Sequence, residues 1–179
     1  MKSIALAAGA LLALAQGAGA WPAPQSPAIP EASGYVSIPG AAFMPATGKV
    51  YRAVFDATRG AGKPTELLPA IDMAASELNA LAVEGVPLAH AKFALVFHGR
   101  AIDGILDDAH YRAKFGVKNP NLAVLSKMRD QGVGLYVCGQ NLVADDIDPL
   151  SLTSDVKVAS DALLALIELE GQGYALLSY

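Results

Sequence analysis

From residue 49 onward, short β-rich runs alternate with segments of helical periodicity, and this alternation restricts the possible folds most. Runs rich in β-branched and aromatic residues predict strands at 49–55, 92–97, 134–137, 156–158 and 174–177. Apolar residues at helical spacing between them predict helices within 67–82, 107–115, 119–132 and 160–171. Because parallel strands are joined by crossover segments of about this length, the pattern predicts an α/β fold with a mostly parallel sheet and helices on both faces.

The first 20 residues have the features of a secretory signal peptide. Lys2 precedes an apolar run over 4–15, and small residues follow up to Ala20. We therefore predict that residues 1–20 are cleaved from the chain before Trp21. The apolar run is shorter than the roughly 20 residues that a bilayer-spanning helix needs. The expected mature protein is periplasmic or secreted and has no membrane span.

Residues 21–48 form a proline-rich stretch, in which six of the eleven prolines lie between Pro22 and Pro45. Such a composition favours extended backbone without regular hydrogen bonding. We interpret the stretch as an N-terminal arm that serves as a tether or lies across a neighbouring molecule. The domain proper is then expected at 49–179.

Composition and spacing exclude several classes of function. The 13 basic and 17 acidic residues argue against a nucleic-acid partner, which usually requires a basic excess. A single cysteine permits no intrachain disulfide, and the three separated histidines show no metal-ligand spacing. The glycine-rich loop at 59–65 lacks the full phosphate-loop pattern. We expect neither a metal nor a cofactor.

Polar residues follow the first three predicted strands, at the edge where open parallel sheets bind their ligands. They are Asp56, Thr58 and Arg59; His98, Gly99 and Arg100; and Cys138, Gly139, Gln140 and Asn141. A short helix predicted at 140–144 would bring its positive amino end close to Cys138 and favour the reactive thiolate. The other interpretation is a buried cysteine that packs as a small apolar side chain.

The segment 132–140, GVGLYVCGQ, resembles the strand-to-cysteine segment of the DsrE/DsrF-like family. Residues 50–60, 94–99 and 119–125 are also similar to members of this family, and the resemblance extends over 49–179. It implies a three-layer α/β/α sandwich with a five-stranded, mainly parallel sheet, and assembly as a homo-oligomer.

The resemblance also implies a chemistry, because the sulfur-relay branch of the family carries sulfane sulfur as a cysteine persulfide. Cys138 occupies the place of that cysteine, whereas Asp145–Asp146 replaces the Arg-Gly pair that relay members often carry. The expected function is an exported sulfur carrier or sulfurtransferase-like protein. Its partners would be donor and acceptor thiol proteins or small sulfur compounds.

The residues around Cys138 suggest roles in this chemistry. His98 or Arg59 would stabilise the sulfur anion. Gln140 or Asn141 would donate hydrogen bonds to it. Gly99 and Gly139 are the remaining supporting residues of the expected site. The alternative is a noncatalytic oligomeric binding or assembly module, in which the cysteine is packed and inert.

Overall fold

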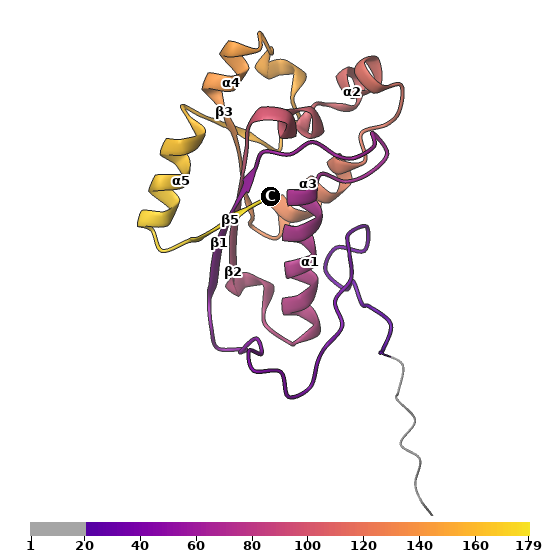
Figure 1. Cartoon of the computed structure of the whole chain (residues 1–179), viewed down its shortest axis with the longest axis vertical. Coiled ribbons are helices and arrows are strands. Elements are labelled where there is room, and N and C mark those ends of the chain that lie inside the picture. Colours follow the sequence, from indigo (N-terminus) through magenta and orange to yellow (C-terminus); the bar gives the residue numbers. More distant parts are fainter. Residues whose placement is uncertain (1–20) are drawn as a thin grey trace, which may run out of the picture.

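The computed structural model describes residues 21–179 and contains one five-stranded sheet with the order β4-β3-β2-β1-β5 (Figure 1). Each of the four strand pairings is parallel. The strands are β1 (Tyr51–Ala57), β2 (Ala91–Phe97), β3 (Gly134–Cys138), β4 (Lys157–Ala159) and β5 (Ala175–Ser178). The predicted strands are therefore all present, with shifts of one or two residues at their ends.

Helices cover both faces of the sheet, which confirms the predicted α/β class and the three-layer arrangement. In Figure 1, α1 and α3 lie on one side of the sheet and α5 lies on the other. The longer helices are α1 (Pro69–Val83), α2 (Asp108–Phe115), α3 (Asn121–Asp130) and α5 (Ala162–Gly171). Shorter segments are η1 (Leu88–His90), η2 (Gly99–Ile105), α4 (Gly139–Ala144) and η3 (Pro149–Ser151).

Alternation along the strands divides the core into two parts, because successive side chains point to opposite faces of a sheet. Phe55, Leu95 and Val137 belong to the larger cluster, beneath α1 and α3. Val54 and Val96 belong to a smaller cluster, where they pack with Ala162 and Leu166 of α5, as Cys138 does. The side chain of Cys138 therefore lies on the α5 face of the sheet.

Part of the proline-rich arm packs against the chain's own α1, which differs from the expected tether. Ile29 is fully buried in the larger cluster. The Asn79 side chain of α1 accepts hydrogen bonds from the N–H groups of Ala28 and Ile29 and donates to the carbonyls of Ile29 and Ser33. Because these backbone groups find partners on a buried side chain, the segment needs no regular secondary structure to be satisfied. The folded unit thus begins well before residue 49.

No helix within residues 21–179 is both long and apolar enough to cross a membrane. The predicted signal peptide at 1–20 lies outside the described residues.

Candidate functional site

The carboxyl ends of β2 and β3 bring most of the predicted site residues to one edge of the sheet. Cys138 is the last residue of β3, and α4 begins at once with Gly139. On the neighbouring strand, His98 follows β2 and Gly99 begins η2. The Asn141 side chain joins the two connections, because its Oδ1 accepts a hydrogen bond of 3.3 Å from the Gly99 N–H.

Cys138 is buried, with only 4% of its surface exposed, and its thiol is free. It packs with the apolar side chains of Val54, Val96 and Leu166. These neighbours exclude water and by themselves disfavour a charged sulfur. Any stabilisation of a thiolate must therefore come from polar groups of the protein.

Such a group is the backbone N–H of Ala162, which donates a hydrogen bond of 3.3 Å to Cys138 Sγ. Ala162 is the first residue of α5, so its N–H has no acceptor within the helix. The side chain of Asp161 instead accepts the N–H of Leu164, at 3.1 Å. Cys138 Sγ thus meets the positive end of α5, where negative charge is stabilised.

This arrangement corrects the expected role of α4. Cys138 occupies the N-cap position of α4, but its side chain forms no capping bond with that helix. The two amides expected to donate to the sulfur form other bonds among the described residues: Gln140 Nε2 donates to the Ser160 carbonyl at 3.2 Å, and Asn141 Oδ1 accepts from the Gly99 N–H. The hydrogen bond to sulfur comes from α5.

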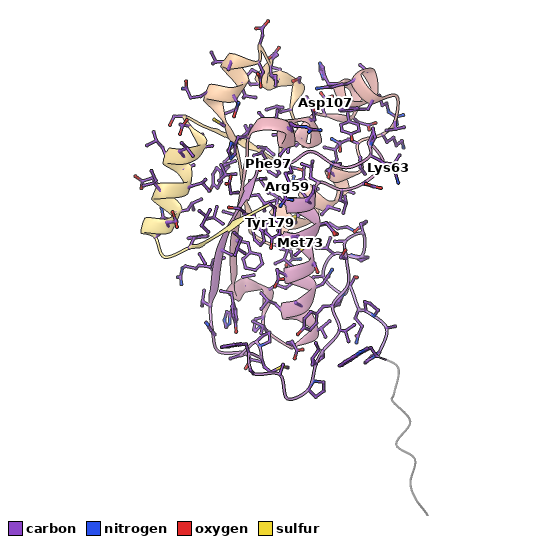
Figure 2. All side chains as sticks on the ribbon, viewed as in Figure 1. Arg59, Lys63, Met73, Phe97, Asp107 and Tyr179 are labelled. Carbon is purple, nitrogen blue, oxygen red and sulfur yellow. The ribbon has the colours of Figure 1, made fainter. Side chains whose placement is uncertain are left out.

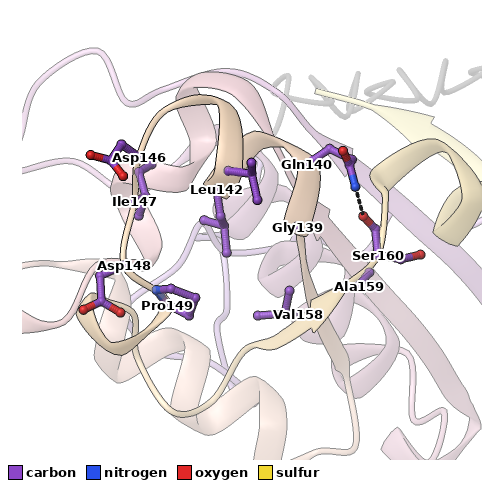
Figure 3. A pocket seen from close by; sticks show the side chains of 11 residues that line it. Gly139, Gln140, Leu142, Asp146, Ile147, Asp148, Pro149, Val158, Ala159 and Ser160 are labelled. Atoms are coloured by element: carbon purple, nitrogen blue, oxygen red, sulfur yellow. Dashed lines mark hydrogen bonds between the residues drawn. The ribbon is translucent and has the colours of Figure 1, made fainter.

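The connection from β4 to α5 lies directly against the start of α4. A Cβ added to Gly139 would stand 2.8 Å from the Ala159 carbonyl oxygen and 3.3 Å from that of Ser160. Glycine is therefore required here by the close approach of two backbone segments. The Gln140–Ser160 hydrogen bond (Figure 3) joins the same two segments, and together with this packing it holds the start of α5 next to β3.

An open groove of about 930 Å³ lies beside this packed junction (Figure 3). Its walls are α4, the loop at 146–149 and residues 158–160. Gly139, which directly follows Cys138, and Ser160, two residues before Ala162, both line the groove. The junction of α4 with the β4–α5 connection therefore lies between the buried sulfur and this groove.

His98 forms a short polar pair with Asp56 at the same edge, with 2.6 Å between Nε2 and Oδ1. Arg59 lies near this end of the sheet but is exposed, and it takes no part in the bond to sulfur (Figure 2). Sequence reasoning placed Asp56 at the edge but gave it no role. The signal that could have found it is the period-2 alternation, which puts Asp56, His98 and Cys138 on one face.

Among residues 21–179, no group of three or more His, Cys, Asp or Glu side chains could hold a metal ion.

The fold and the edge define a three-layer α/β/α protein whose single cysteine ends a central strand. The sequence model of the DsrE/DsrF-like family matches residues 52–179, and the chain belongs to this family. The comparison with curated proteins returned no match.

Solved structures show the same fold. One is a protein of unknown function, MTH1491, from Methanobacterium thermoautotrophicum, with 17% identity and a TM-score of 0.54 over 72% of this chain and 99% of that chain. Another is the YchN protein from E. coli, with 16% identity and a TM-score of 0.53 over 73% of this chain and 100% of that chain. At such identities the likeness concerns the fold alone.

The close approach at Gly139 generates a prediction. Replacing Gly139 with alanine forces β4 away from α4, because the clashing atom belongs to the backbone. We expect Gly139→Ala to lower the free energy of unfolding by about 1–3 kcal/mol in urea titrations. Gly171, whose Cβ would meet nothing within 4 Å, is the matched control, and Gly171→Ala should leave the stability unchanged or raise it. Equal effects of the two substitutions would contradict the packing described.

Proposed function

We propose that this protein carries sulfane sulfur as a persulfide on Cys138. The observation that supports the proposal is the hydrogen bond from Ala162 N at the amino end of α5 to Cys138 Sγ. A thiolate is the nucleophile in sulfur transfer, and a helix amino end stabilises it. Membership of a family that includes sulfur-relay proteins points in the same direction.

The buried position of Cys138 Sγ suits a sulfur carrier in which other molecules reach the persulfide only by a defined route. A persulfide that remains in water is open to oxidation and to attack by other thiols. The groove beside Gly139 and Ser160 offers a route, once the Gln140–Ser160 hydrogen bond opens. The donors and acceptors would be thiol proteins or small sulfur compounds that reach Cys138 from this groove.

The test is sulfur loading of the folded protein. We expect incubation with glutathione persulfide to add the mass of one sulfur atom to the wild type, as measured by intact mass spectrometry. Cys138→Ser is the control, because its hydroxyl can still accept the Ala162 N–H but cannot hold sulfane sulfur. Wild-type protein that gains no sulfur would contradict the proposal.

A noncatalytic assembly module is the second candidate, and the burial of Cys138 favours it. In that case Sγ only satisfies the free N–H of α5 and packs against its apolar neighbours. Iodoacetamide would then label Cys138 in denatured protein but not in native protein. A carrier should be labelled in both states.

We further propose that the protein is a homo-oligomer that uses the outer face of α5. Leu163 and Ile167 are 63% and 62% exposed on this helix, and Leu164 is exposed beside them. A helix that is apolar on its outer face as well as its inner face is typical of a buried position. A second copy of the chain would cover this face.

Light scattering of the protein lacking residues 1–20 tests the oligomer. We expect the wild type to exceed the monomer mass at micromolar concentration, and the double variant Leu163→Glu/Ile167→Glu to fall to it. Glu170→Gln, a change at an exposed polar position of the same helix, should leave the mass unchanged. A wild type that stays at the monomer mass would rule out this assembly.

We also propose export to the periplasm or the outside of the cell, on the evidence of the charged start, apolar run and small residues at 1–20. The protein recovered from an envelope fraction should have the mass of a chain beginning at Trp21. Recovery of a chain that still begins with Met1 would show that no cleavage occurs.

A further inference from the structure

Asp56 and His98 form a short polar contact at the carboxyl edge, with 2.6 Å between His98 Nε2 and Asp56 Oδ1. Asp56 belongs to β1, and His98 directly follows β2. Their side chains are only 19% and 22% exposed, so the pair is partly shielded from water. A charge-assisted hydrogen bond of this length is stronger than one between neutral groups.

His98 lies level with Cys138 on the α5 face, and Asp56, which is opposite Val96, lies one same-face position earlier on β1. In the pairing of β2 with β3, Phe97 is opposite Val137, and one further step places His98 opposite Cys138. Neighbouring strands lie about 4.8 Å apart. Val54, Val96 and Cys138 all belong to the α5-side cluster, so the alternation puts Asp56 and His98 on that side too. Asp56, His98 and Cys138 therefore lie on the same face of the sheet, at the ends of the adjacent strands β1, β2 and β3.

The bond to Asp56 determines which nitrogen of the imidazole is available. A carboxylate accepts hydrogen bonds, so Nε2 carries the proton that it donates to Asp56. In the neutral ring the lone pair is then on Nδ1. Within residues 21–179, Asp56 is the one hydrogen-bond partner of the ring, so Nδ1 is available to exchange a proton.

We propose that His98 transfers the proton in the sulfur exchange at Cys138, and that Asp56 is the positioning residue that fixes the His98 tautomer. The substrate class is a persulfide, R–S–SH, of a small thiol or of a partner protein. This inference rests on the proposed carrier function and specifies its chemistry.

The step balances without any further reagent. The Cys138 thiol gives its proton to Nδ1 of His98, and the thiolate attacks the outer sulfur of R–S–SH. A new S–S bond forms as the S–S bond of the donor breaks, and its electron pair leaves with RS⁻. The imidazolium then protonates RS⁻ to RSH. Cys138 is oxidised to the persulfide and the donor is reduced to the thiol, and the reverse step unloads the carrier.

A purely structural role for the pair is the competing explanation, because the contact also ties the ends of β1 and β2 together. Other charged groups of the elements around this edge are Arg59 after β1, Arg100 and Asp103 of η2, Asp145 after α4 and Asp161 before α5. The experiment therefore needs a readout that a loss of stability alone would not change.

Single-turnover loading from glutathione persulfide at constant pH provides the first readout. General acid–base catalysis contributes about 10²-fold or more, so His98→Gln should slow loading by roughly 10²-fold. Asp56→Asn should slow it by roughly tenfold, and the double variant should be no slower than His98→Gln, because Asp56 acts through His98. The extent of loading after long incubation should stay at one sulfur. His110→Gln is the matched control, since His110 forms a similar but exposed pair with Asp107, at 2.9 Å.

The ¹⁵N spectrum of the histidine rings provides the second readout, and its first measurement is made on the wild type, which a folding defect cannot confuse. The wild-type His98 ring should be protonated on Nε2, and Asp56→Asn should shift it toward the Nδ1-protonated form. Wild-type protein with the proton on Nδ1, or variants that load as fast as the wild type, would overturn this inference and leave the carrier function intact. A wild type that never loads overturns the carrier function and this inference with it.

Discussion

The hydrogen bond from the Ala162 N–H to Cys138 Sγ connects the end of β3 to the start of α5. The candidate site depends on this contact. Cys138 lies among apolar side chains, and this N–H is the polar group that bonds its sulfur. The contact requires α5 to begin where it does. That start is held by the Asp161 cap, by the absence of a Cβ at Gly139 and by the Gln140–Ser160 bond.

The fold was largely predictable because its signals are local. Each strand is a short run of β-formers, each longer helix has apolar residues at helical spacing, and the alternation of the two dictates a parallel sheet. The carboxyl-edge location of Cys138 follows from the same pattern. The α4 segment was also predicted, but the helix whose amino end reaches the sulfur begins at Ala162, 24 residues after Cys138. Such a contact depends on the pairing of β3 with β4, which no local signal specifies.

Two other features arise from contacts between distant segments. Ile29 enters the core because Asn79, some 50 residues later, satisfies its backbone groups. A proline-rich composition indicates extended backbone, but it says nothing about a partner on a helix. His98 was expected beside Cys138, whereas its bond to Asp56 depends on side-chain direction across two strands. Alternation assigns both side chains to one face, and only the three-dimensional structure shows that they meet.

The central claim is that Cys138 Sγ, held at the amino end of α5, is the atom that receives sulfur. A crystal structure of protein treated with a persulfide donor, with anomalous diffraction from sulfur, tests this most directly. The account predicts a second sulfur bonded to Cys138 Sγ, with the Ala162 N–H within hydrogen-bonding distance of the persulfide. A single, unchanged sulfur at Cys138 after treatment, still bonded to Ala162 and closed off from the groove, would contradict it.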